Sequence, residues 1–220
     1  MKDKHKSDTL ILGALLSLSG GFQDAYTYVL RGNVFANAQT GNVVLMSQHL
    51  MTGEFRTALH YLLPIIAFAF GILAAEQIAH EFKKLDIIYW RHIILIIEMI
   101  VLIVVAFLPE ALNTPANVLV SFSCAMQVQA FREVKGHSYA STMCIGNLRS
   151  GTESFSKYLR TRDKTQIVDS LYYFGIILIF AIGAGLGGII SDIIGYKSIL
   201  ISSLILLIAN LTMIQKKREG

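Results

Sequence analysis

Six long apolar stretches limit what this chain can fold into more than any other feature of its sequence. A helix needs about 20 mostly apolar residues to cross the roughly 30 Å hydrocarbon core of a bilayer. Only 15% of the 220 residues are charged, whereas an average soluble domain carries roughly 25%. The sequence therefore predicts an all-α integral membrane protein, with transmembrane spans at residues 10–31, 57–82, 91–108, 115–134, 166–190 and 196–214.

The first of these stretches follows a basic start and imitates a secretory signal. Its apolar run continues to Leu30, which is further than the apolar region of such a signal extends. We therefore expect an uncleaved first transmembrane helix.

Two other stretches, residues 36–52 and 138–156, are polar, contain glycine and are marginal as spans. The distribution of lysine and arginine separates the possible topologies, because these residues gather on the cytoplasmic side. If neither stretch crosses and the N-terminus is cytoplasmic, 16 of the 19 basic residues lie inside and only Arg31, Arg56 and Lys197 lie outside. If both stretches crossed, the split would be 12 to 7. The sequence thus predicts six spans, with both termini in the cytoplasm.

An internal duplication divides the chain into two repeats, residues 1–110 and 111–220. The stretch "DIIYWRHIILII" aligns with "DIIGYKSILISS" at an offset of 106 residues. Each repeat holds three spans, so the second copy must be inverted in the membrane, as in many transporters that bind their substrate near the midplane. Further pairs lie 105 residues apart: Ala25 with Ala130, Tyr26 with Phe131, Val29 with Val134, Gly41 with Gly146, and Asn42 with Asn147.

In this 3+3 inverted repeat, each half carries a short re-entrant or broken helix with a Gly-Asn turn. The two segments enter the membrane from opposite faces. Irregular backbone at membrane depth is tolerated only where protein buries it or where it lines a water-filled cavity. Thr40 or Asn42 is a candidate cap of the first short helix, whose free N–H groups would then face a ligand.

The segments "GGFQDAYTYVL" and "NVFANAQTGNVV", with a weaker second "GN" copy, resemble the YoaK-type family of small bacterial membrane proteins, which is grouped under a domain of unknown function. The resemblance covers nearly the whole chain. It implies a six-span protein of the bacterial cytoplasmic membrane, and it supplies no substrate and no catalytic residue. Members of the family often carry threonine in the second Thr-Gly-Asn, where this chain has Ile145. The two halves therefore need not contribute equally to a site.

Polar side chains inside predicted spans are costly, and they mark a site or pathway by default. Asp24 lies in the outer part of the first span and Glu98 near the middle of the third. A structural hydrogen bond or ion pair is the alternative for both acids, and hydrogen bonding between helices is the alternative for Gln127 and Gln129. The predicted substrate or ion pathway consists of Gln23, Asp24, Asn37, Gln39, Thr40, Gly41, Asn42, Glu98, Gln127, Gln129, Gly146 and Asn147.

These features predict a secondary transporter, or a channel, for a small solute or ion, with a midplane site at the repeat interface. The alternative is a non-transporting membrane protein, either an accessory subunit or a small membrane-embedded enzyme. Common enzyme motifs are missing from the sequence, so we expect neither an enzyme nor a bound cofactor or metal. Cys124 and Cys144 have no metal-ligand spacing and are interpreted as small buried residues.

The lipid bilayer is the partner that the composition indicates. Basic residues are not interleaved with aromatic ones, so nucleic acid is not expected. Small residues at close spacing in "GAGLGGIISDIIG" favour close helix packing, within the chain or in a homodimer, with a gating hinge as the alternative. The glycines concerned are Gly183, Gly185, Gly187 and Gly188.

Overall fold

The computed structural model describes residues 4–82, 87–134, 137–138, 142 and 144–218, and almost all of them are helical. The prediction of an all-α protein is confirmed, with one antiparallel pair of two-residue strands as the exception among the described residues. The elements in chain order are α1 (Lys4–Leu30), α2 (Gln39–Met51), α3 (Phe55–Phe82), α4 (Ile87–Ala106), the 3₁₀ turn η1 (Glu110–Leu112), α5 (Asn113–Ala130), β1 (Glu133–Val134), β2 (His137–Ser138), α6 (Cys144–Thr161), α7 (Lys164–Ile194), the 3₁₀ turn η2 (Gly195–Ser198) and α8 (Ile199–Arg218).

Helices α1, α3, α4, α5, α7 and α8 occupy the six predicted spans, and α2 and α6 occupy the two marginal segments. Both α2 and α6 are continuous, so neither is a broken helix. Among the described residues, two stretches are long and apolar enough to cross a bilayer by length and composition alone, Phe55–Phe82 and Lys164–Met213. The second stretch contains α7, η2 and most of α8.

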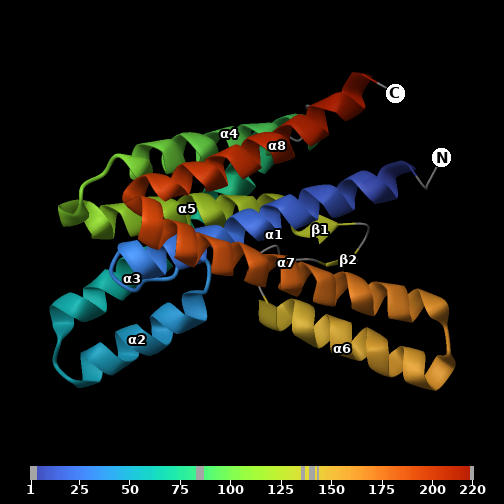
Figure 1. Ribbon diagram of the computed structural model, residues 1–220, viewed down its shortest axis with the longest axis horizontal. Helices are drawn as coiled ribbons and strands as arrows, with labels where there is room; N and C mark the ends of the chain where they lie inside the picture. Colours follow the sequence, from blue (N-terminus) through green and yellow to red (C-terminus); the bar gives the residue numbers. More distant parts are fainter. Residues whose placement is uncertain (1–3, 83–86, 135–136, 139–141, 143, 219–220) are drawn as a thin grey trace.

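Each helix packs mainly against helices that are distant in the sequence. Helix α1 lies against α7 and α8, while α5 lies against α3 and α4. The short helix α2 folds back along α3, and α6 folds back along α7. Both chain ends lie at the same end of the molecule, and the α2–α3 and α6–α7 turns lie at opposite ends (Figure 1).

Glycine brings the backbones of α1 and α7 into direct contact. A Cβ atom added to Gly183 would lie 2.2 Å from the carbonyl oxygen of Leu18, and one added to Gly187 would lie 2.7 Å from that of Phe22. The packing predicted for the glycine run of α7 is therefore confirmed within the chain at these two positions. Added Cβ atoms at Gly185 and Gly188 would meet nothing within 4 Å, because these residues face away from α1.

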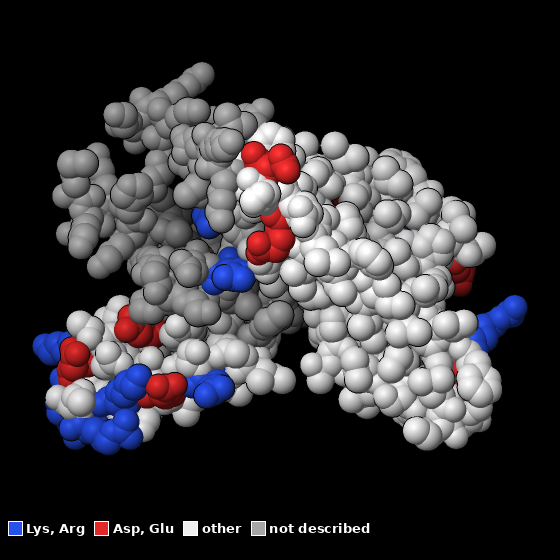
Figure 2. All heavy atoms as spheres, turned by 180° about the vertical axis from the view of Figure 1, so that it is seen from behind, with Lys and Arg blue, Asp and Glu red and all other residues white. Residues whose placement is uncertain are grey.

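The surface is largely uncharged. Figure 2 shows a broad face without charged side chains over the body of the molecule, and charges gathered on the arm formed by α6 and the start of α7. A notch separates this arm from the α2–α3 hairpin (Figure 2). Large apolar side chains are exposed along α3, α7 and α8, which is typical of a surface that contacts lipid rather than water. Examples are Phe70, Leu178, Ile189, Ile193 and Leu204.

Candidate functional site

A cluster of polar side chains is completely buried where α1, α4, α5 and α8 meet. Nε2 of Gln23 lies 3.0 Å from both Ser19 Oγ and Glu98 Oε1. The same nitrogen lies 3.0 Å from Ser202 Oγ, which is 2.7 Å from Ser19 Oγ. On the other side of the amide, the thiol of Cys124 donates a hydrogen bond to Gln23 Oε1. We refer to these five residues as the Gln23 cluster.

Glu98 is the acid of this cluster, and it has no exposed surface. Its Oε1 accepts a hydrogen bond from Gln23, whereas Oε2 has no partner among the described residues. Leaving a buried polar atom without a hydrogen bond costs about 1–3 kcal/mol, and more for a charged group. Such atoms in a folded protein therefore need a functional or structural reason.

The second buried acid, Asp24, is bound by the loop between α1 and α2. The backbone N–H of Asn37 donates to Asp24 Oδ1 over 2.6 Å. An aspartate that accepts a hydrogen bond from the backbone of a loop can fix the course of that loop. Asp24 therefore holds the start of α2 against the middle of α1.

The Thr-Gly-Asn turn stabilises the same loop. The side chain of Asn42 accepts from the backbone N–H of Phe35 and donates to its carbonyl oxygen, over 3.0 and 2.7 Å. A further bond joins Asn42 Nδ2 to Gln39 Oε1 at 2.9 Å. Gly41 has no side chain to obstruct the Phe35 ring, which would lie 2.9 Å from an added Cβ atom. The turn therefore binds its own loop.

The prediction that Thr40 or Asn42 caps α2 is wrong. The N-cap residue is Ala38, which makes no side-chain capping bond, and Thr40 is exposed. The backbone N–H groups of Gln39 and Gly41 in the first turn of α2 donate to the carbonyl oxygens of Asn37 and Ala38, and Asp24 binds the N–H of Asn37 just before the helix.

Asn37, which precedes α2, and Thr142, which precedes α6, meet at Gly20 in the middle of α1. Asn37 Nδ2 donates to the carbonyl oxygen of Gly20 over 3.3 Å. Thr142 Cγ2 lies so close that a Cβ atom on Gly20 would be 2.4 Å away. Oδ1 of Asn37 and Oγ1 of Thr142 are both buried without a partner among the described residues. At this meeting point, two buried oxygen atoms therefore make no hydrogen bond to any described residue.

The Gln23 cluster and this meeting point are neighbours. The thiol of Cys124 hydrogen-bonds to Gln23 and lies within electrostatic reach of Glu98, Asp24 and Asn37. The structure thus brings together four of the predicted site residues, Gln23, Asp24, Asn37 and Glu98.

Other predicted residues lie apart or have different roles. Gln129 donates to Glu76 near the end of α3, away from the Gln23 cluster. Gly146 is exposed and Asn147 is buried, both in the first turn of α6. Gln127 is fully buried in α5, and neither polar atom of its amide has a partner among the described residues. Gln39 donates to the carbonyl oxygen of Ala36.

Sequence reasoning missed Ser19, Cys124, Thr142 and Ser202 as members of the site. The four-residue spacing of Ser19 and Gln23 places both on one helix face and was a usable signal. Ser202 gave no signal, because an isolated serine in an apolar helix is common.

Arg31 is a buried cation just after the end of α1. The sequence analysis counted it among the basic residues on the outer side, and its side chain is completely buried within the protein. Its guanidinium donates to the carbonyl oxygens of Val105 and Leu108, over 2.8 and 3.1 Å, at the end of α4. A cation is favourable there, because carbonyl groups at a helix C-terminus carry partial negative charge. The ring of Tyr196 lies 4.2 Å from the guanidinium and joins η2 to this contact.

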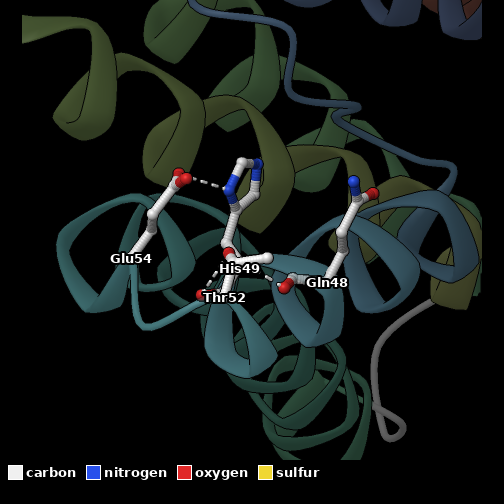
Figure 3. A network of polar contacts seen from close by, with 4 residues as sticks. All are labelled: Gln48, His49, Thr52 and Glu54. Carbon is white, nitrogen blue, oxygen red and sulfur yellow. Dashed lines mark hydrogen bonds and ion pairs between the residues drawn. The ribbon is translucent and has the colours of Figure 1, made fainter.

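A separate polar network lies at the C-terminal end of α2 (Figure 3). His49 Nδ1 lies 2.8 Å from Glu54 Oε2, and Thr52 Oγ1 donates to the carbonyl oxygens of Gln48 and His49. The imidazole also stacks on Tyr61 of α3, with 5.7 Å between ring centres. These contacts stabilise the α2–α3 turn and so fix α2 along α3.

The sequence from residue 12 to residue 212 matches a protein family described as "Protein of unknown function (DUF1275)". The chain belongs to this family. This DUF1275 protein is also 26% identical over 180 residues to "UPF0700 transmembrane protein YoaK" of Bacillus subtilis (strain 168), with 78% of this chain and 79% of that protein covered. The family resemblance predicted from the two motifs is confirmed. No solved structure matches the DUF1275 chain.

Proposed function

We propose that the chain is a six-span protein of the bacterial cytoplasmic membrane, built as an inverted repeat of residues 1–110 and 111–220, with both termini cytoplasmic. Helix packing supports this architecture, because contacts in one half have counterparts in the other. The contact of α1 with α7 corresponds to that of α5 with α3, and α1 with α8 corresponds to α5 with α4. Likewise, α2 with α3 corresponds to α6 with α7.

Two aromatic contacts support the same symmetry. The Arg31 guanidinium lies over Tyr26 and Tyr196, at 5.6 and 4.2 Å from the ring centres. At the other end of the molecule, Arg91 lies over Phe131 and Trp90, at 5.4 and 5.8 Å. Phe131 follows Tyr26 by 105 residues, and Tyr196 follows Trp90 by 106. Each arginine thus joins one aromatic ring from each repeat.

We further propose that the protein is a secondary transporter for a small polar solute or ion, with its site between the two repeats. The observation that carries this proposal is the meeting of Asn37 and Thr142 at Gly20, next to the Gln23 cluster, with buried polar atoms that no described residue satisfies. In many transporters, short helices begin near the midplane at the repeat interface and form the substrate site. Helix α2 has 13 residues and is therefore roughly 20 Å long, too short to cross the bilayer.

The chemistry of the site favours a cation or a proton-coupled solute. Asp24 and Glu98 contribute two carboxyl groups. The Gln23 cluster contains no lysine, arginine or histidine to neutralise Glu98. Because a buried carboxylate without a cationic partner is costly, a proton or another cation would stabilise Glu98 during transport.

Proteoliposome uptake tests this function. A panel of small polar solutes is offered with and without an imposed proton gradient. Glu98→Gln keeps the shape of the side chain and removes the exchangeable proton, so we expect gradient-driven uptake to fall about tenfold or more. Glu110→Gln changes an exposed acid outside the cluster and should leave uptake unchanged. The transporter proposal is wrong if the wild type moves none of the solutes, or if Glu98→Gln transports like the wild type.

The complete burial of the Gln23 cluster favours one alternative, a non-transporting membrane protein in which the cluster only joins helices. Cysteine accessibility separates the two functions. In a background without the native cysteines, Asn37→Cys and Thr142→Cys are treated with a small impermeant reagent from each side of the membrane. A transport site predicts labelling that a solute alters, whereas uniform protection at both positions would support the alternative.

A further inference from the structure

A pocket of about 350 Å³ lies where α3 ends, α4 begins and α5 ends. Helix α5 ends toward the side of the molecule where the chain begins and ends (Figure 1), and none of the residues of the Gln23 cluster lines the pocket. Its volume is at the lower limit of ordinary ligand pockets, which suits a small ligand or headgroup. The pocket is lined by Glu76, Ala79, His80, Trp90, Arg91, Gln129, Ala130 and Arg132.

Among the described residues that line this pocket, the charged side chains are Glu76, Arg91 and Arg132. Glu76 is hydrogen-bonded to the amide of Gln129 across the pocket wall. The guanidinium of Arg91 is positioned by the rings of Trp90 and Phe131, 5.8 and 5.4 Å away. The arginines contribute the positive charge, and the Glu76–Gln129 pair contributes both a hydrogen-bond acceptor and a donor.

We propose that this pocket binds a phosphodiester, either the headgroup of a membrane phospholipid or a small soluble phosphodiester. Guanidinium groups bind phosphate oxygens with paired, charge-assisted hydrogen bonds. A phosphodiester carries one negative charge, which the two guanidinium groups of the lining attract. The Glu76–Gln129 pair can bind the hydroxyl or ammonium groups of the alcohol that the phosphate esterifies, such as glycerol or ethanolamine.

The place of the pocket supports a ligand at the membrane surface. Three helix ends meet there, and the tryptophan in its wall is typical of the membrane–water boundary. Basic pockets between helices on the cytoplasmic side bind phospholipid headgroups in other membrane proteins. The proposal does not depend on transport, because none of the residues of the Gln23 cluster lines the pocket.

Trp90 makes the pocket directly observable, since it is the only tryptophan of the chain. Purified full-length protein in detergent is titrated with phosphatidylglycerol, with its deacylated product glycerophosphoglycerol, and with diacylglycerol of the same acyl chains. We expect a saturable change of tryptophan fluorescence with phosphatidylglycerol, and none with diacylglycerol. A response to phosphatidylglycerol alone identifies a lipid site, and a response to glycerophosphoglycerol as well identifies a site that also accepts soluble phosphodiesters.

Two variants test the residues. Arg91→Gln/Arg132→Gln removes both guanidinium groups and should weaken phosphodiester binding about tenfold or more. Ala79→Leu fills the pocket, keeps every charge, and should block binding as well. The matched control Arg149→Gln/Arg160→Gln removes two exposed arginines from α6 and should bind as the wild type does.

The proposal is overturned if neither phosphodiester gives a saturable response, or if diacylglycerol gives the same response as phosphatidylglycerol. It is also overturned if the double variant binds with unchanged affinity while it is folded by circular dichroism and monodisperse in gel filtration. Should the double variant not fold, Ala79→Leu decides, because unchanged binding in that variant is incompatible with occupation of the pocket.

Discussion

Asn42 and Asn37 are buried amides of the same segment, yet their hydrogen bonding differs. Asn42 uses its oxygen and its nitrogen on the loop around Phe35. Asn37 donates through Nδ2 to Gly20, while its Oδ1 has no partner among the described residues. A side chain that is satisfied by its own loop serves the fold, whereas one with a buried free acceptor is available to a ligand. This difference moves the candidate site from the Thr-Gly-Asn turn to the residues before it.

The role of Asn42 predicts a loss of stability on substitution. Asn42→Ala removes the bonds to both polar atoms of the Phe35 backbone, so we expect the free energy of unfolding to fall by about 1–3 kcal/mol. Denaturant unfolding in detergent, followed by circular dichroism, measures the change. Ser47→Ala is the matched control on the same helix, since Ser47 is exposed and bonds only to the carbonyl oxygen of Val43. Equal stability of the two variants would contradict the assigned role.

Several site residues could be predicted at this scale and others could not. Gln23, Asp24 and Glu98 stand out in the sequence because polar groups inside apolar stretches are rare. The bond from Asn42 to Phe35 spans seven residues and depends on a loop conformation that no periodic pattern encodes. The burial of Arg31 could not be predicted, because a count of basic residues does not reveal that helix carbonyl groups bind its guanidinium.

Helices α1 and α7 show how small residues set the distance between two elements. The added Cβ distances at Gly183 and Gly187 leave no space for a side chain between the two backbones. The same relation holds for α3 and α5, where a Cβ atom on Gly71 would be 2.2 Å from the carbonyl oxygen of Phe122. The existence and limits of these helices could be predicted from their apolar length. Their partners could not, because glycine spacing does not specify which helix approaches.

Two glycines of α7 provide a matched test of this contact. In Gly183→Ala the new methyl group collides with the backbone of α1, so we expect a loss of about 1–3 kcal/mol in the free energy of unfolding. In Gly185→Ala the methyl group meets nothing within 4 Å. This control should be neutral, or more stable by up to about 1 kcal/mol because alanine favours a helix. Thermal unfolding of both variants in detergent distinguishes them, and a destabilised Gly185→Ala would argue against the packing described.

The first turn of α7 should depend on pH. The pKa of Asp163 is lowered from its usual value, mainly because its carboxylate accepts a hydrogen bond from the backbone N–H of Thr165. A lowered pKa in the folded state means that the carboxylate stabilises this turn above the usual pKa of aspartate. The stabilisation is lost as the pH falls through the lowered pKa. Hydrogen exchange of residues 164–168, corrected for intrinsic rates, should therefore show increased opening in acid.

Asp163→Asn is the control for this experiment. Asparagine also caps helices and does not titrate in this range. Opening of the turn should then be independent of pH. The same acid-dependent opening in the variant would show that another group is responsible.

In the whole molecule the two halves exchange helices, in the sense that the first helix of each half packs against helices of the other half. Helix α1 of the first half packs on α7 and α8, and α5 of the second half packs on α3 and α4. Neither half therefore encloses its first helix by itself. The duplication in the sequence indicated two related halves, but it contained no information on this exchange, because residue matches between repeats do not reveal contacts between them.

The proposed topology predicts which turns an impermeant reagent can reach from each side of the membrane. Met51 at the α2–α3 turn is 90% exposed, and Lys164 at the α6–α7 turn is also exposed. In a background with serine at both native cysteines, Met51→Cys should react with an impermeant maleimide in intact cells. Lys164→Cys should react only after the membrane is permeabilised. Labelling of both positions in intact cells would contradict six spans with cytoplasmic termini.

The exchange of helices also has a consequence for synthesis. Helix α1 ends at Leu30, whereas its main partner α7 begins at Lys164. At ribosomal rates of about 5–20 residues per second, the interval between the synthesis of α1 and that of α7 is on the order of ten seconds. During this interval the face of α1 around Leu18 and Phe22 lacks the helix that covers it. We expect the insertion machinery to shelter α1 until translation is nearly complete, and products truncated before α7 to be degraded by membrane proteases.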